Sequence, residues 1–323
     1  METKKLLTIL LCGALLSGLN AQEKQIDKTF SGVKRIRIST SSGDVYVKKG
    51  SGSDVRVQLD YDEEDMEPEI EQNGETLRLS EERDRGWGGR WNNRRNSRTK
   101  WTLTVPENLR YDFNTASGNF EIINVKAEEI EGNTASGDLL IENTGKAEID
   151  VNTASGDLTI SNNEGNISAN TASGDVKITD ANGEIKLNTA SGDVRVRKVT
   201  GRFDINTASG NATVESAKIT GRSKFNTASG DVSVSLSGDL TADLEISTAS
   251  GDGTLDLNGS KLDAYVEMVA RANRNRIRAP FDFDDEKTFR KWGNEYERKT
   301  KKLGSAKNQV IIETASGRIS INK

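Results

Sequence analysis

The four residues Thr-Ala-Ser-Gly recur nine times in this chain of 323 residues, and a close copy, Thr-Ser-Ser-Gly, begins at Thr40. The glycines of eight successive copies follow one another at intervals of 18 to 21 residues. That period is too short for helical repeats and suits the coils of a β-solenoid, so the chain is predicted to stack on itself. The structural turns are assigned to Gly118, Gly137, Gly156, Gly174, Gly192, Gly210, Gly230 and Gly251.

One repeat unit indicates how a coil is built. Ile185, Leu187 and Thr189 alternate with polar residues, as in a strand with one buried face. Strict alternation from Thr189 would turn Val194 and Val196 outward, so a corner is predicted at Ala-Ser-Gly-Asp, where glycine would supply a positive φ. The expected fold is an all-β, single-chain solenoid with two short strands per coil. A second turn is predicted near Asn182-Gly183, Thr200-Gly201 and Thr220-Gly221.

Stacked coils place equivalent residues above one another at about 4.8 Å per rung. The asparagines before the repeat are therefore predicted to form a ladder of hydrogen-bonded amides. The aspartates after it would form an acidic ladder, for which bound calcium is a weaker hypothesis, because each coil offers one carboxylate. No metal site is assigned. The two ladders are Asn114, Asn133, Asn152, Asn170, Asn188, Asn206 and Asn226, and Asp138, Asp157, Asp175, Asp193, Asp231 and Asp252.

The first residues have the features of a secretory signal. Lys4 and Lys5 precede an apolar stretch, and cleavage is predicted after Ala21. Lipidation of Cys12 is disfavoured, because Leu11 before it is large for a lipobox. Removal of Cys12, the only cysteine, excludes disulfides and thiol chemistry in the mature chain. The expected location is extracytoplasmic, in the periplasm or at the outer membrane or cell surface, with no transmembrane segment.

Composition narrows the function further. The chain has no histidine, which excludes serine–histidine triads and histidine metal sites. The net charge of −5 argues against a nucleic-acid partner. Paired carboxylates, as in glycosidases, are the remaining route to catalysis, and no pair stands out. The chain is therefore predicted not to be an enzyme and to need no cofactor.

The longest interruption of the repeat separates Gly43 from Gly118. Eight carboxylates and no basic residue lie between Asp60 and Glu71, whereas seven basic residues lie between Arg83 and Trp101. Arginine forks suit anionic groups and indole faces stack on sugars or cations, so this loop is a candidate glycan-binding site. The alternative is a solvated hairpin tip that the acidic stretch neutralises. The candidate residues are Arg85, Trp87, Arg90, Trp91, Arg94 and Arg95.

Two further elements are expected in this interruption. A hairpin is predicted from Glu69 to Ser80 with Asn73-Gly74 as its turn. Trp101 alternates in step with the apolar residues that follow it, so it is predicted to lie in the core.

A second interruption runs from about 272 to 306. The segment from Asp284 to Lys302 is predicted as a short helix, because Phe289, Trp292 and Tyr296 recur at helical spacing. The helix would cover the open end of the solenoid or dock a partner. The expected organisation is a signal at 1–21, an N-terminal β region at 22–108, regular coils at 109–260 and C-terminal coils with this insertion at 261–323.

The repeated Asn-Thr-Ala-Ser-Gly-Asp resembles the bacterial β-strand-repeat family whose members are described as candidate adhesins of unknown function. The most specific similarity is Leu103 to Pro106 followed by Phe113 to Gly118. The resemblance covers most of the mature chain and implies an extracytoplasmic, right-handed β-helix with no catalytic residues. Both interruptions depart from the short connections common in the family.

These observations favour a non-enzymatic envelope protein that presents an elongated surface for adhesion or scaffolding. A glycan-binding module centred on the loop at 83–101 is the alternative, and a polysaccharide-acting enzyme is the third hypothesis. An envelope glycan or a protein is the expected partner. The sequence leaves the ligand and the oligomeric state open.

Overall fold

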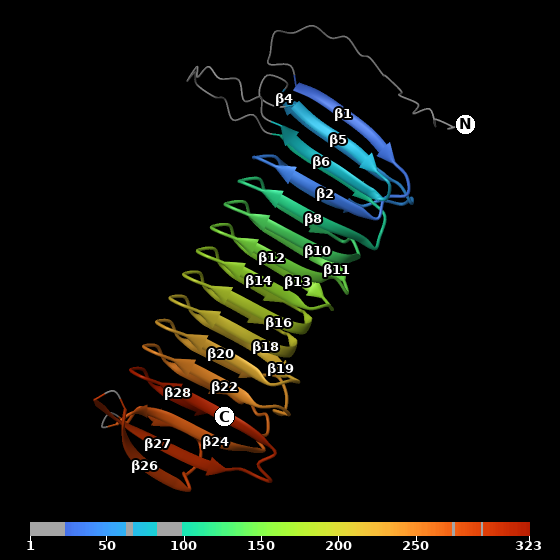
Figure 1. The fold of residues 1–323 in the computed structure, drawn as a ribbon. Helices are drawn as coiled ribbons and strands as arrows, with labels where there is room; N and C mark the ends of the chain where they lie inside the picture. The colour runs from blue at the N-terminus through green and yellow to red at the C-terminus, as the bar shows by residue number, and fades with distance from the viewer. Residues whose placement is uncertain (1–22, 63–66, 83–98, 273–274, 292) are drawn as a thin grey trace.

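The structure is a computed structural model that describes residues 23–62, 67–82, 99–272, 275–291 and 293–323. These residues form 29 β-strands and no helix. The all-β prediction is therefore confirmed. Most strands run parallel to the neighbouring strands of the adjacent coils, and the coils stack into an elongated solenoid (Figure 1).

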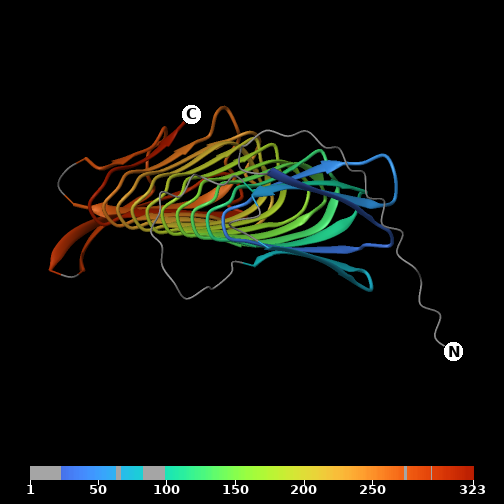
Figure 2. The same cartoon turned by 90° about the horizontal axis from the view of Figure 1, so that it is seen from above.

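Each regular coil contributes one strand to each of two sheets, sheet B and sheet A. Viewed from above, the coils overlap as narrow loops (Figure 2). In sheet B lie β2 (Arg35–Thr40), β8 (Leu109–Thr115), β10 (Ala127–Thr134), β12 (Glu148–Thr153), β14 (Ile167–Thr171), β16 (Asn182–Thr189), β18 (Thr200–Thr207), β20 (Ser223–Thr227), β22 (Leu244–Thr248) and β28 (Asn308–Thr314). In sheet A lie β3 (Asp44–Lys49), β9 (Phe120–Ile123), β11 (Leu139–Gly145), β13 (Leu158–Asn163), β15 (Val176–Thr179), β17 (Val194–Arg197), β19 (Ala212–Ile219), β21 (Val232–Leu236), β23 (Gly253–Asp256) and β29 (Ile319–Asn322).

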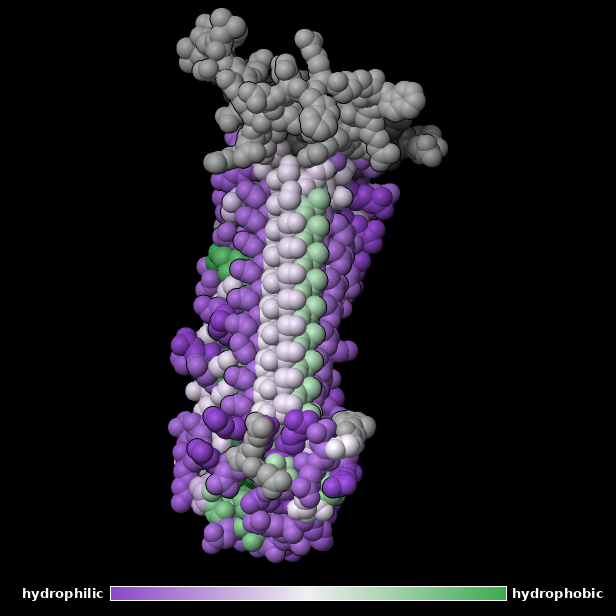
Figure 3. Space-filling view, turned by 90° about the vertical axis from the view of Figure 1, so that its left-hand side faces the viewer, coloured by the Kyte–Doolittle hydropathy of each residue, from purple (hydrophilic) through white to green (hydrophobic). Residues whose placement is uncertain are grey.

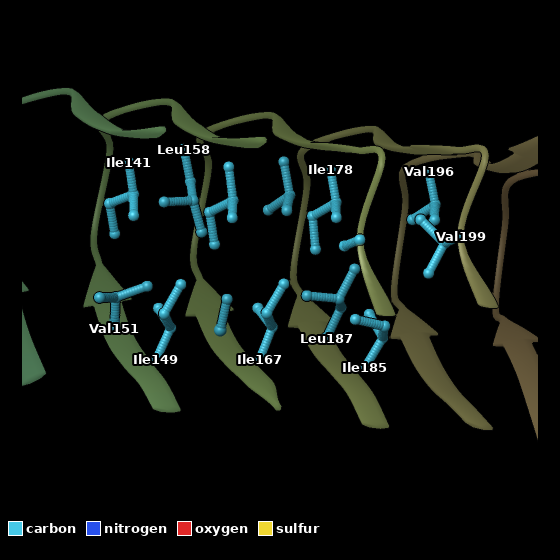
Figure 4. Packing of buried hydrophobic residues seen from close by; sticks show 14 of the residues in the cluster. Ile141, Ile149, Val151, Leu158, Ile167, Ile178, Ile185, Leu187, Val196 and Val199 are labelled. Carbon is cyan, nitrogen blue, oxygen red and sulfur yellow. The ribbon is translucent and has the colours of Figure 1, made fainter. Parts of the chain in front are cut away.

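The core fills the space between the two sheets. Ile185 and Leu187 of β16 and Val194 and Val196 of β17 are each at most 1% exposed. Figure 4 shows how apolar side chains from the two sheets point toward one another, coil after coil. Both pairs can face inward only because the chain bends between Thr189 and Val194, which confirms the predicted corner.

The corner glycines are required for a different reason from the one predicted. None of those in the regular coils has positive φ. A Cβ added to Gly192 would lie 1.9 Å from the carbonyl oxygen of Gly174, and the other coils repeat this close approach. The corner is also closed locally, because the Gly192 N–H donates to Thr189 Oγ1 at 3.0 Å. Glycine is needed to let successive coils touch.

The second turn of each coil was predicted at Asn182-Gly183 and Thr200-Gly201, among other positions. In these two coils it lies a few residues earlier in the chain. Asp180 and Lys198 have φ of 53° and 54° and form the turn. Gly183 and Gly201 instead lie near the start of β16 and β18. A Cβ on Gly201 would lie 1.8 Å from the Gly183 carbonyl oxygen, so close stacking again explains the glycine.

At the N-terminal end the chain changes the order of its coils. β2 lies between β8 and β6 (Thr76–Glu82), and β3 lies between β9 and β7 (Lys100–Val105). The later coil, β6 with β7, therefore stacks outside the earlier one. Antiparallel strands β5 (Glu67–Asn73), β4 (Val55–Asp62) and β1 (Glu23–Phe30) extend the two sheets further.

Two predictions for this end are confirmed. Strands β5 and β6 form the expected hairpin, in which Asn73 pairs with Thr76 and Gly74 has φ of 59°. Trp101 is fully buried, and its indole Nε1 donates to Glu81 Oε1 at 3.0 Å.

The C-terminal end repeats the exchange of coil order. β28 lies between β22 and β24 (Ala264–Arg271), and β29 lies between β23 and the short β25 (Ile277–Arg278). The final repeat is thus enclosed by a coil that precedes it in sequence. Antiparallel strands β27 (Asn294–Lys302) and β26 (Asp285–Lys291) then extend sheet B beyond β24.

The predicted helix between Asp284 and Lys302 is wrong, because the segment forms the hairpin β26–β27. Lys291 pairs with Asn294 next to the turn, and Gly293 has φ of 74°. Phe289 and Tyr296 lie equally far from this turn, so they pair across the hairpin with ring centroids 5.9 Å apart. The same spacing would have placed them on one face of a helix.

Candidate ligand-binding groove

A band of small residues runs along the corner at which sheet B ends. Figure 3 shows it as a straight pale strip between polar flanks. Within the regular coils the repeat's alanines and serines are exposed, while its threonines and glycines are mostly buried. Backbone hydrogen bonds link successive coils along the band. Ala190 N–H donates to Thr171 O at 3.1 Å, and Ser191 N–H donates to Ala172 O at 3.0 Å. The coils from β8 to β22 repeat this pair of bonds, so these corner N–H groups point toward the N-terminal end.

The asparagine ladder flanks this band, as predicted. Asn188 Nδ2 donates to Asn170 Oδ1 at 2.8 Å, and Asn206 Nδ2 donates to Asn188 Oδ1 at 3.0 Å. The same bond continues from Asn114 to Asn226. Asn206 also donates to Asp204 Oδ1 at 3.0 Å, whereas Asn152, Asn170 and Asn188 each use one N–H group and one acceptor position of the oxygen in the ladder. The remaining donor and acceptor positions of these three amides can meet a ligand.

A groove of about 990 Å³ follows the ladder and the band. It extends from β12 to β28, and its lining is the asparagine, threonine and alanine of successive coils. At its C-terminal end the lining changes to Val269 of β24, Lys291 of β26, Tyr296 of β27 and Glu313 of β28. The end hairpin thus forms a wall that closes one end of a repeating surface.

The groove is almost uncharged. Among the described residues that line it, only Lys291 and Glu313 are charged, and both lie at the walled end. The ladder also changes there, because Ser247 takes the place of asparagine and its Oγ donates to Glu313 Oε1 at 3.0 Å. A lining of amides, hydroxyls and methyl groups suits a neutral ligand that forms hydrogen bonds along its length.

The aspartate ladder lies on the other side of the corner and is used by the backbone. Asp193 N–H donates to Asp175 Oδ1 at 2.8 Å, and Asp175 N–H donates to Asp157 Oδ1 at 2.8 Å. Arg195 also contacts Asp175 and Asp193. Among the residues that the structure describes, no group of three or more acidic, histidine or cysteine side chains is arranged to hold a metal ion.

Two charged side chains terminate the corner. At the N-terminal end Glu81 Oε2 accepts the N–H groups of Ser41 at 2.8 Å and Ser42 at 3.4 Å, in the place of the carbonyls of a preceding coil. At the other end the buried Arg276 donates to Gly317 O at 3.0 Å and also to Ser316 O. In an inner coil the carbonyl oxygen of Gly251, which is equivalent to that of Gly317, accepts a hydrogen bond from the Thr314 hydroxyl at 3.1 Å. Both side chains therefore replace missing coils.

Arg85, Trp87, Arg90, Trp91, Arg94 and Arg95 lie outside the described residues. The segment that contains them connects β6 to β7, whereas the lining of the groove begins at Asn152. The two candidate sites therefore lie in different coils.

Sequence reasoning missed the groove although it found the residues that line it. The repeat predicted the asparagine ladder as a structural feature. The wall formed by Tyr296 and Lys291 was hidden by the helix prediction. Glu81 and Arg276 were also missed, because their roles depend on coils that are not adjacent in sequence.

The family model described as Toastrack DUF4097 matches residues 33–164, 109–185 and 164–280. These overlapping matches include the asparagine ladder and most coils of the groove. A search of curated proteins finds no match.

The chain is also similar to solved bacterial structures. One is a candidate cell adhesion protein from Clostridium sporogenes, at 13% identity over 93% of this chain and 98% of that chain, with a TM-score of 0.23. Another is a candidate lipid binding protein from Parabacteroides distasonis, at 18% identity, 94% and 98% coverage and a TM-score of 0.40. A third is a candidate adhesin from the same species, at 11% identity, 93% and 98% coverage and a TM-score of 0.40.

Proposed function

The chain belongs to the Toastrack DUF4097 family. We propose that it is a non-enzymatic, adhesin-like envelope protein and that its groove binds an extended neutral glycan. The observation that carries the proposal is the groove itself, in which successive coils present the same asparagine, threonine and alanine. A repeating surface suits a repeating ligand, because each added sugar can make the contacts of the one before it.

The chemistry of the lining supports a glycan. The exposed ladder amides offer donors and acceptors to hydroxyl groups. The exposed alanine methyl groups offer apolar surface to the faces of sugar rings. The near absence of charge disfavours a polyanion, which would need basic side chains along its whole length.

The lining also supports binding without hydrolysis. Glycosidases place two carboxyl groups on either side of the scissile bond. Glu313 is the one carboxylate among the residues that line this groove, and the chain contains no histidine to replace the second. We therefore assign the groove to binding.

The proposed location is the periplasm or the outer surface of the cell. Its support is the signal-like sequence at 1–21, with positive charge, an apolar stretch and Ala21. In the part of the chain that the structure describes, no helix could span a bilayer.

The loop between β6 and β7 remains a second candidate for glycan binding. Its support is the two tryptophans and the arginines between Arg83 and Trp101. The loop hypothesis and the groove hypothesis predict different variants to be inactive.

A panel of immobilised neutral and acidic glycans tests both hypotheses. Three proteins are compared: the wild type, Ala190→Trp with Ala208→Trp, and a variant that lacks Arg85 to Arg95. Both alanines are exposed in the groove, so the tryptophans fill it without entering the core. Lys177→Trp, exposed on β15 of sheet A, is the matched control.

The groove proposal expects the wild type and Lys177→Trp to retain a neutral glycan and the double tryptophan variant to lose it. Loss in the loop deletion alone would move the site to the loop. Retention by all four proteins would overturn both assignments.

A further inference from the structure

Sheet B ends in two strands that each have one partner among the described residues. At the N-terminal end β5 pairs with β6, and at the C-terminal end β26 pairs with β27. Figure 1 shows these strands near opposite ends of the solenoid. Each therefore presents one edge of backbone groups, which is a template for another strand, and on β5 this edge lacks one donor because Pro68 has no N–H.

The two edges differ in charge, because β5 carries three glutamates, whereas β26 carries three basic residues against Asp285 and Glu286. Glu67, Glu69 and Glu71 alternate along β5 and are exposed, whereas Ile70 between them packs against the core. In the described residues neither Glu67 nor Glu71 forms an ion pair. Lys287 and Lys291 lie along β26 on the face where Phe289 stacks on Tyr296, and Lys287 also forms an ion pair with Asp285 at 3.0 Å, which a partner carboxylate would share.

The directions of the strands suit an antiparallel pair. β6 runs parallel to the body of sheet B, and β5 runs antiparallel to β6. β24 also runs parallel to the body, and two successive antiparallel steps through β27 return β26 to that direction. When two molecules are placed head to tail, β5 of one therefore runs opposite to β26 of the next.

One register joins complementary residues on the same face. If Glu69 lies opposite Phe289, Glu67 lies opposite Lys291 and Glu71 lies opposite Lys287. Opposite charges directly across an antiparallel pair stabilise it, whereas like charges destabilise it. The same rule disfavours two β5 edges or two β26 edges, so the charges select the unlike ends.

The ends of the two sheets are offset in compatible directions. Beyond β28 and β29, sheet B continues with three strands, β24, β27 and β26, while sheet A continues only with the short β25. Beyond β2 and β3, sheet A continues with β7, β4 and β1, while sheet B continues with β6 and β5. The longer sheet of one end thus meets the shorter sheet of the other.

We infer that this chain associates head to tail with a second copy of itself, through β5 of one molecule and β26 of the next. The contact joins two different surfaces, so it does not close on itself and extends into a filament. Charged edge strands usually prevent pairing. Here the charge on β5 is opposite in sign to that of the lysines on β26. Repulsion therefore opposes the pairing of two β5 strands or of two β26 strands, but not the pairing of β5 with β26.

Sedimentation velocity of the purified protein tests the inference. At about 0.02 M salt, where exposed charges act over a long range, the weight-average mass of the wild type should at least double as concentration rises. High salt should reverse the change. A mass that stays monomeric at every concentration would overturn the inference.

Charge reversal supplies the decisive comparison. Lys287→Glu with Lys291→Glu makes both ends acidic, and Glu67→Lys with Glu71→Lys makes both ends basic. Each variant alone should remain monomeric, and an equal mixture of the two should regain the association of the wild type. Association of either variant alone, or a mixture that stays monomeric while both keep the wild-type unfolding midpoint, would contradict the proposed contact.

A cross-link keeps the test valid if charge reversal disturbs folding. In a Cys12→Ser background, Glu69→Cys with Phe289→Cys places two cysteines opposite each other in the proposed register, within the reach of a disulfide. Oxidation should yield a ladder of covalent multimers. Asn73→Cys with Phe289→Cys is the displaced control, and equal cross-linking of both pairs would reject the register.

Discussion

Glu81 and Arg276 terminate opposite ends of one corner of the solenoid, the negative side chain at the N–H end and the positive side chain at the C=O end. The two residues belong to the outermost parallel coils, which cover the first and last copies of the repeat. Aligned peptide groups leave partial positive charge at their N–H end and partial negative charge at their C=O end, as in a helix. The placement of both charges is therefore favourable.

Removing the Glu81 carboxylate should expose this end of the stack. Glu81→Ala leaves the N–H groups of Ser41 and Ser42 and the buried Trp101 indole without their acceptor. An unpaired buried donor costs about 1–3 kcal/mol, so the free energy of unfolding should fall by about that amount. Glu131→Ala, an exposed change on β10, should have little effect in the same urea titration. Equal stability of the two variants would contradict the capping role.

A methyl group at a corner glycine should be enough to destabilise the stack. Gly192→Ala places its Cβ against the Gly174 carbonyl, so the coils must separate or bend. Such overpacking costs about 1–3 kcal/mol or more. At Gly238 an added Cβ meets no atom within 4 Å, so Gly238→Ala is the control and should stay within about 0.5 kcal/mol of the wild type. Differential scanning calorimetry compares the two midpoints, and a similar effect of both changes would refute close stacking as the reason for glycine.

Interrupting the asparagine ladder should weaken the middle of the molecule. Asn188→Ala removes the bonds that this amide makes with Asn170 and Asn206. At about 0.5–1.5 kcal/mol for each hydrogen bond, the expected loss is about 1–3 kcal/mol. Lys177→Ala, exposed on sheet A, is the control. Hydrogen exchange should be faster in the coils around β16 of the Asn188 variant, and unchanged protection there would show that the ladder contributes nothing to stability.

Acid should loosen the contact that Asp284 makes with β27 in the C-terminal hairpin. Hydrogen bonds from Lys301 Nζ at 2.7 Å and from the Lys302 N–H at 2.8 Å lower the pKa of Asp284. A lowered pKa means that its stabilisation is present above the ordinary value near 3.9 and is lost as pH falls through the lower, folded value. Asp284→Asn should remove this pH dependence. The Lys302 amide signal in NMR spectra reports the change, and a signal that stays constant down to about pH 2 would refute it.

The repeat predicted what depends on a single coil. Thr189 and the valines after it define the corner, and Asn188 defines the ladder, because identical residues in stacked coils must meet. The helix prediction failed at Phe289 and Tyr296, whose spacing fits a helical face and a hairpin equally well. The order of the end coils could not be predicted. Strands β6 and β8 have the same alternation of apolar and polar residues, so either could pair with β2, and both do. The roles of Glu81 and Arg276, and the wall of the groove, follow from that order.

The affinity of the purified protein for oligosaccharides of increasing length, measured by calorimetry with a neutral glycan retained on the panel, tests the repeating groove most directly. The account predicts that affinity rises with each added sugar until the groove from β12 to β28 is filled, and that Ala190→Trp with Ala208→Trp lowers it by about tenfold or more, or about 1.4 kcal/mol. An affinity that is independent of length and unchanged in the tryptophan variant would contradict it.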